Sequence, residues 1–105
     1  MLMQKVLVIG GAGERGAKFC EKLINEGRDV VCVDTFKQGY EHITELYNGN
    51  RHRLVLLPFD ADREWNLGLY SWDEIYFLLD PVKHPTALKN MEQLAEKANT
   101  KVTIC

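Results

Sequence analysis

The chain has 105 residues, of which 46% are hydrophobic and 27% charged, a composition typical of one soluble globular domain spanning residues 1–105. Its 13 lysines and arginines stand against 15 aspartates and glutamates, so the formal net charge of −2 argues against a general nucleic-acid-binding protein. The apolar runs are too short to cross a bilayer, and no signal-peptide pattern is present. We therefore expect a cytoplasmic protein that binds neither membranes nor nucleic acid. The 3 cysteines share no short spacing, which excludes a disulfide framework.

Strand and helix patterns alternate along the chain. The β-branched and aliphatic run Gln4–Ile9 predicts a strand buried on both faces. Apolar residues spaced three to four apart then predict a helix over Glu14–Glu26, stopped by Gly27. Residues 60–71 show no clear period. By the same criteria, further strands are predicted over Asp29–Asp34, Arg53–Leu57, Glu74–Leu79 and Lys101–Ile104, and further helices over Glu41–Tyr47 and Pro85–Ala98.

This alternation predicts an α/β fold, in which parallel strands are joined by right-handed crossovers and helices cover both faces of the sheet. We expect a Rossmann-type, doubly wound sheet of five strands in the order 3-2-1-4-5. The order reverses between strands one and four, and ligands of such sheets bind in the crevice at the carboxyl ends of the strands there. The residues that follow the predicted strands are therefore the candidates for a binding site.

A glycine-rich turn follows the first predicted strand. Residues 10–16 read GGAGERG, which satisfies GxGxxG through Gly11, Gly13 and Gly16, and GxxGxxG through Gly10, Gly13 and Gly16. Glycines at these positions allow a tight turn, leave bare backbone for a pyrophosphate, and let the next helix pack closely. The N-terminus of that helix offers free N–H groups and a partial positive charge to phosphates. The motif predicts a nucleotide-binding turn.

An acidic residue, Asp34, ends the second predicted strand. It lies near the spacing from Gly16 at which a carboxylate holds the ribose 2′-hydroxyl of a dinucleotide. A carboxylate there repels a 2′-phosphate, so the pattern favours NAD over NADP. The alternative is a structural turn followed by a solvated strand end, with no ligand.

The segments KVLVIGGAGERG and VVCVDTFKQG resemble the extended short-chain dehydrogenase/reductases, which include NAD-dependent nucleotide-sugar epimerases and dehydratases. The sequence looks most like the N-terminal part of UDP-glucuronate decarboxylases, whose pattern is GGAGFIG or GGAGFVG, followed after a helix by VVDNFFTG. LLPFDAD and DEIYFLLDP resemble the family's third and fourth strands in order. The resemblance covers most of this chain but only part of a full-length relative.

The resemblance implies a set of contacts to NAD. It places glycines at the pyrophosphate, an acidic strand end at the adenosine ribose, and the segments after the third and fourth strands at the adenine and along the crevice. The positions implied are Gly10, Gly13 and Gly16 for the pyrophosphate, Asp34 with Thr35 and Phe36 for the ribose, Asp60 and Ala61 for the adenine edge, and Leu78 and Leu79 for the crevice.

Three positions depart from the family's pattern. Glu14 and Arg15 replace an aromatic or aliphatic pair, and Asp80 replaces a small residue at the end of strand four. Glu14 either faces the phosphates or complements the helix dipole, and Arg15 either pairs with the pyrophosphate or is solvated; both alternatives stay open. We include both residues among the candidate cofactor contacts.

The resemblance also implies a catalytic Tyr with a Lys four residues on, and a Ser or Thr after strand five. None of the tyrosines at positions 40, 47, 70 and 76 has such a lysine, and the family's sugar-binding domain has no counterpart here. We therefore expect no catalytic residue in this chain and a module that binds NAD or an adenine nucleotide without turnover. The alternatives are an interaction or regulatory protein that pairs with itself or another chain, and an enzyme completed by a second chain.

Other chemistry-bearing residues are scattered. His42, His52 and His84 lie in three segments without metal-ligand spacing, so we expect no metal site. Cys20 and Cys32 fall at apolar positions and are expected in the core. Three aromatic residues precede strand four, either as a cover on the core or as a stacking or partner surface, namely Trp65, Tyr70 and Trp72.

Overall fold

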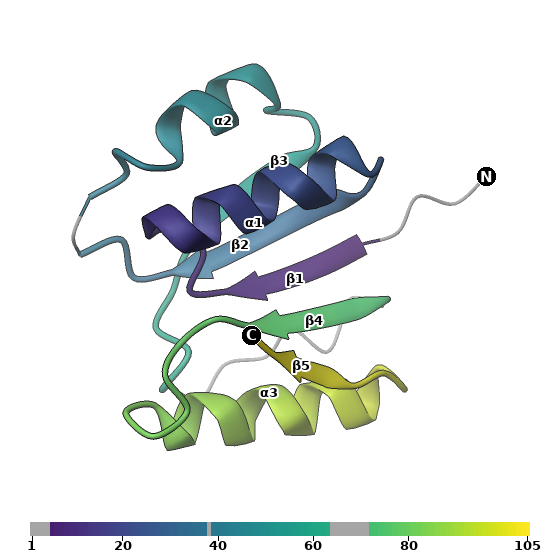
Figure 1. The fold of residues 1–105 in the computed structure, drawn as a ribbon. Helices are drawn as coiled ribbons and strands as arrows, with labels where there is room; N and C mark the ends of the chain where they lie inside the picture. Colours follow the sequence, from purple (N-terminus) through teal and green to yellow (C-terminus); the bar gives the residue numbers. More distant parts are fainter. Residues whose placement is uncertain (1–4, 38, 64–71) are drawn as a thin grey trace.

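A computed structural model describes residues 5–37, 39–63 and 72–105 as a parallel five-stranded sheet between helices (Figure 1). The strand order is β3-β2-β1-β4-β5, which confirms the predicted α/β class and the predicted topology. Register follows from parallel pairing, with Val8 opposite Cys32 on one side and Tyr76 on the other. The strands are β1 (Lys5–Ile9), β2 (Asp29–Asp34), β3 (Leu54–Pro58), β4 (Glu74–Phe77) and β5 (Val102–Ile104), and the helices are α1 (Glu14–Asn25), α2 (Thr44–Gly49) and α3 (Pro85–Lys97).

The central strand β1 divides the core into two layers. Successive side chains of a strand point to opposite faces, so Val6 and Val8 pack into one apolar cluster while Leu7 and Ile9 pack into the other. All four side chains are fully buried. Helix α1 contributes to the first cluster and α3 to the second, and Figure 1 shows these helices on opposite sides of the sheet. Burial on both faces explains the continuous apolar run of β1.

The second helix differs most from its predicted bounds. It covers Thr44–Gly49 rather than starting at Glu41, because a turn precedes it. The Tyr40 carbonyl accepts hydrogen bonds from the backbone N–H groups of Ile43 and Thr44 and from the Thr44 hydroxyl. Ile43 is fully buried at the N-cap position, so an apolar residue that sequence periodicity assigns to a helix instead anchors the turn before it.

Smaller differences occur at strand ends. Pro58 extends β3 because it pairs with Asp34 at the last position of the ladder, and the Phe59 N–H then donates to the Asp34 carbonyl. Strand β4 ends at Phe77, two residues before its predicted end. Both changes lie at the carboxyl edge of the sheet, where the chain leaves the ladder to form the candidate site.

The predicted core cysteines are confirmed, since Cys20 and Cys32 are fully buried. A hydrogen bond with the Cys20 thiol, together with burial, raises the pKa of the Cys32 thiol, so it stays protonated and unreactive. Trp72 is buried in the layer under α3, which fits a cover on the core, whereas residues 65 and 70 lie outside the described part of the chain. No helix within the described ranges is long and apolar enough to span a membrane.

Candidate functional site

A cavity of about 370 Å³ lies at the carboxyl ends of β1, β2 and β3. This volume falls in the range of about 300–1,000 Å³ that is common for small-molecule sites. The strand order predicts a crevice at the carboxyl ends of β1 and β4, and the cavity reaches that point at Gly10 and Leu79 but lies mainly over the ends of β2 and β3. Eight of the twelve predicted cofactor contacts line the cavity. These eight are Gly10, Gly13, Asp34, Thr35, Phe36, Asp60, Ala61 and Leu79.

The glycine turn forms one wall of the cavity. Gly10 has a φ of +88°, a left-handed conformation that side chains rarely adopt, and its N–H donates to the Val33 carbonyl at 2.8 Å. A Cβ at Gly16 would lie 2.5 Å from the Gly11 Cα and 2.7 Å from the Gly10 carbonyl oxygen, so the first turn of α1 packs directly on the backbone before it. Gly13 differs, because a Cβ there would meet no atom within 4 Å. The turn therefore has no room for a side chain at Gly16, where α1 packs on it, but has free space at Gly13.

Helix α1 begins at this open position. Gly13 is the N-cap, and no side chain caps the helix. The N–H groups of the first turn of a helix have no partner within the helix, so here they are available to an anion. The Gly13 carbonyl accepts from the Ala17 N–H at 2.9 Å, which fixes the direction of the first turn.

The side chains of Glu14 and Arg15 lie outside the cavity. Glu14 pairs with Lys18 at 3.4 Å on the exposed side of α1. Arg15 donates to the carbonyl oxygens of Leu78 at 3.0 Å and Cys105 at 3.1 Å, and so links α1 to the end of β4 and to the residue after β5. Arg15 is exposed, as the solvated alternative expects, and its guanidinium in addition binds two backbone carbonyl oxygens. Gly16 and Leu78 also do not line the cavity.

Asp34 lies beside the glycine turn and is bonded to it. Its Oδ2 accepts a hydrogen bond from the Ala12 N–H at 3.2 Å, and its Oδ1 accepts from the Phe36 N–H at 3.0 Å. A carboxylate has about four lone-pair directions, so two acceptor positions stay open for a ligand hydroxyl. Asp34 thus fixes the turn and faces the cavity with its negative charge.

Phe36 shapes the same end of the cavity. Its φ is +56°, which is unusual for a bulky residue and is held by the hydrogen bond to Asp34. Phe36 as a whole is 7% exposed, and its ring stacks on that of Tyr40, with centroids 4.4 Å apart and an angle of 14° between the planes. The cavity therefore has an aromatic wall beside Asp34.

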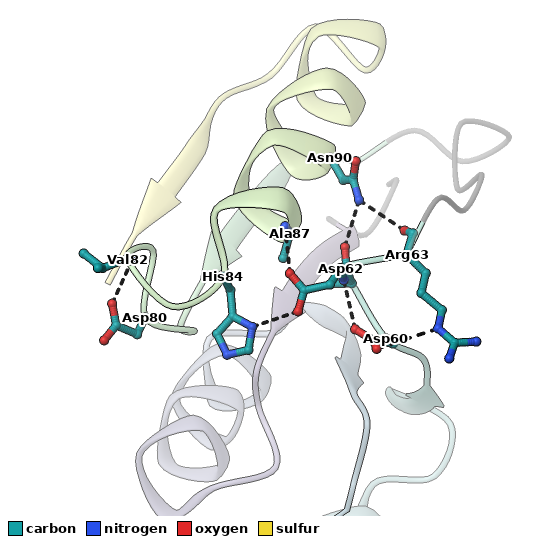
Figure 2. Close-up of polar contacts among 9 residues, drawn as sticks. Asp60, Asp62, Arg63, Asp80, Val82, His84, Ala87 and Asn90 are labelled. Carbon is teal, nitrogen blue, oxygen red and sulfur yellow. Dashed lines mark hydrogen bonds and ion pairs between the residues drawn. The ribbon is translucent and has the colours of Figure 1, made fainter.

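The segment after β3 also lines the cavity, and its contribution extends beyond the predicted contacts Asp60 and Ala61. Asp62 also lines the cavity, together with His84 at the start of α3. Figure 2 shows Asp62 placed between two partners: Oδ2 lies 2.8 Å from His84 Nδ1, and Oδ1 accepts from the Ala87 N–H at 3.1 Å. Asn90 secures the segment by donating to the Ala61 carbonyl at 3.0 Å.

Charge around the cavity is predominantly negative. Four carboxylates line it, whereas Lys37 is the one lysine or arginine among its lining residues in the described chain. Two histidines, His42 and His84, are the other groups that can carry positive charge there. The lining carboxylates belong to Asp34, Glu41, Asp60 and Asp62. An anionic ligand therefore depends on backbone N–H groups, on Lys37 and on the histidines.

Tyr76 is a phenol of the described chain that lies away from this cavity. Burial and a hydrogen bond to Glu74 raise its pKa, so the phenol stays protonated. A general base of the kind implied by the family resemblance needs a lowered pKa. Among the described residues, no group of three or more His, Cys, Asp or Glu side chains could hold a metal ion.

Comparison with known proteins supports the resemblance. The chain is 29% identical over 87 residues to UDP-glucuronic acid decarboxylase 1 of Danio rerio, an alignment that covers 83% of this chain and 20% of the relative. The chain thus spans about a fifth of the curated relatives it matches. No protein-family model matches it.

Solved structures share the fold. UDP-glucose-4-epimerase from Stenotrophomonas maltophila, with bound NAD and formylated UDP-arabinopyranose, superposes with a TM-score of 0.76 at 18% identity, over 96% of this chain and 36% of that one. A short-chain dehydrogenase/reductase from Burkholderia multivorans with bound NADP superposes with a TM-score of 0.66 at 14% identity, over 97% of this chain and 55% of that one. These likenesses establish a Rossmann-like fold for the chain.

Proposed function

We propose that the chain binds NAD, in preference to NADP, in the cavity at the carboxyl ends of β1, β2 and β3. The observation that carries this proposal is that an open, uncapped helix start at Gly13 and the Asp34 carboxylate line the same cavity. A dinucleotide needs both features, an anion site for its pyrophosphate and an acceptor for its ribose hydroxyls.

The pyrophosphate would lie against the glycine turn. The first-turn N–H groups of α1 and the helix dipole attract phosphate oxygens, and Gly13 leaves the space for them. Gly10 and Gly16 support this site indirectly, because they allow the turn and helix to pack without side chains. The carboxylate of Glu14 is turned toward Lys18, which keeps its charge off the open face.

Asp34 would bind the adenosine ribose through its remaining acceptor positions, beside Thr35 and Phe36. The same charge disfavours the 2′-phosphate of NADP. The adenine would lie toward Asp60 and Ala61, which also line the cavity. Leu79 would line the crevice toward the second nucleotide.

The relatives named as decarboxylases and epimerases suggest a cofactor module of a nucleotide-sugar enzyme. We propose that this chain performs the binding step without turnover. Two points support this: none of its four tyrosines has a lysine four residues on, and the phenol of Tyr76 has a raised pKa.

Replacing Asp34 tests the cofactor preference. In Asp34→Asn, NAD affinity should fall about tenfold, because a hydrogen bond to a charged group contributes about 1.5–3 kcal/mol. NADP affinity should stay level or rise, so the dissociation constants of NAD and NADP should become more similar. Calorimetric titration with each dinucleotide measures both constants. The matched control is Asp29→Asn, at the other end of β2, which should leave both affinities unchanged. An unchanged ratio in Asp34→Asn would remove Asp34 from the site.

A further inference from the structure

We propose that His84, held by Asp62, is a second phosphate-binding group of this cavity, which contacts the diphosphate of the dinucleotide only when its ring is protonated. The inference rests on the proposed function and adds to it a residue and a pH dependence. It follows from the position of the pair on the cavity wall, from the use of each ring nitrogen, and from the charge around it.

The pair is fixed on several sides. Asp62 is bound through both carboxylate oxygens, one to His84 Nδ1 and the other to the Ala87 N–H. The His84 backbone is held as well, since its N–H donates to the Asp80 carbonyl at 2.9 Å and its carbonyl accepts from Leu88 at 3.1 Å. Figure 2 shows Nε2 on the side of the ring turned away from Asp62. Within the described residues, Nε2 has no protein partner.

Asp62 determines which ring nitrogen carries a proton. An ionised carboxylate only accepts hydrogen bonds, so Nδ1 must donate to it. In the neutral ring Nε2 is then a lone-pair acceptor, which repels a phosphate oxygen. In the charged ring Nε2 becomes an N–H donor and forms a charge-assisted hydrogen bond with phosphate. A phosphate contact therefore requires the imidazolium.

The negative charge around the cavity makes protonation of His84 important for binding a diphosphate. Carboxylates outnumber permanent cations around the cavity, so a diphosphate gains from each added positive charge. Histidine side chains ordinarily change charge between about pH 5 and 8. The titratable or charged groups that face the pair or adjoin it in the chain are Asp34, Lys37, Glu41 and His42 beyond β2, Asp60, Asp62 and Arg63 after β3, and Asp80 and Lys83 before α3.

Calorimetric titration with NAD at about pH 6 and about pH 8 tests the inference. The unaltered chain should bind NAD about tenfold more weakly at the higher pH. His84→Gln should bind at both pH values as weakly as the unaltered chain does at the higher one. Thermal unfolding of each variant checks that it is folded.

Asp62→Asn provides a second test, in which NAD affinity at the higher pH should change in the direction opposite to a loss of binding. The Ala87 N–H requires an acceptor, so the amide oxygen should face it and the amide NH₂ should face His84. In the neutral ring Nδ1 then accepts and the proton is on Nε2, so Nε2 is a donor whether the ring is neutral or charged. We expect this variant to lose most of the pH dependence and to bind NAD more tightly than the unaltered chain at about pH 8.

His52→Gln is the matched control, because His52 does not line the cavity, and it should retain the full pH dependence. Unchanged pH dependence in His84→Gln, with NAD still bound, would overturn the role of His84 and leave the proposed function standing. A chain that binds no NAD at either pH would overturn both.

Discussion

Replacing Gly16 with alanine is expected to destabilise the fold by about 3 kcal/mol, near the upper end of the range for overpacking. The added Cβ would lie 2.5 Å from the Gly11 Cα and 2.7 Å from the Gly10 carbonyl oxygen. Both are backbone atoms, which cannot rotate away as the tip of a side chain can. To accommodate the methyl group, α1 must lift from the turn and from the fully buried side chains of Val8 and Cys32 in the sheet.

Urea unfolding measures this effect as a lower midpoint with an unchanged slope. Gly49→Ala is the matched control, because a Cβ at that helical position meets nothing within 4 Å. Its stability should stay level or rise by up to about 1 kcal/mol. An unfolding midpoint for Gly16→Ala equal to that of the unaltered chain would show that the helix and turn do not pack as described.

Replacing Gly13 with valine should have the opposite profile, with the fold retained and the NAD site lost. The space around Gly13 is empty to 4 Å, and its φ of −74° is ordinary, so a larger side chain fits. An isopropyl group there would cover the N–H groups at the start of α1. We expect NAD affinity to fall by about 2 kcal/mol, or about 30-fold, since charge-assisted hydrogen bonds to phosphate are lost.

Stability and binding must be measured on the same preparation of Gly13→Val. An apolar N-cap costs about 1 kcal/mol, so the urea midpoint should fall far less than in Gly16→Ala. NAD affinity in Gly49→Ala should equal that of the unaltered chain, because Gly49 does not line the cavity. If Gly13→Val binds NAD as tightly as the unaltered chain, the diphosphate does not lie on this turn.

The sheet could be predicted because burial on both faces gives parallel strands a continuous apolar sequence. β2 has its predicted bounds and β1 ends at its predicted residue, Ile9, whereas the predicted first residue, Gln4, lies outside the described part of the chain. The start of α2 could not be predicted in the same way. Ile43 fits a helical apolar period, yet it is buried in a turn that is closed by hydrogen bonds to the Tyr40 carbonyl. Periodicity indicates which residues are buried and leaves open whether a turn or a helix buries them.

In the candidate site, too, some residues could be predicted from the sequence and others could not. Residues at or just after the carboxyl end of a strand, such as Asp34 and Gly10, could be placed at the cavity because parallel strands end at one edge. The Asp62–His84 pair could not, since it joins segments 22 positions apart through tertiary packing. The direction of the Arg15 side chain could not be predicted either, because the carbonyl oxygens that it binds belong to residues that follow β4 and β5.

If backbone N–H groups at the start of α1 hold the diphosphate of NAD, their amide chemical shifts must respond to the ligand, and a ¹H–¹⁵N NMR titration of the unaltered chain measures them. With increasing NAD, the signals of Gly13, Glu14 and Arg15 should shift in a saturable way, together with those beside Asp34. Unchanged signals at about millimolar NAD, or shifts confined to residues remote from the cavity, such as those of β5, would contradict this binding site.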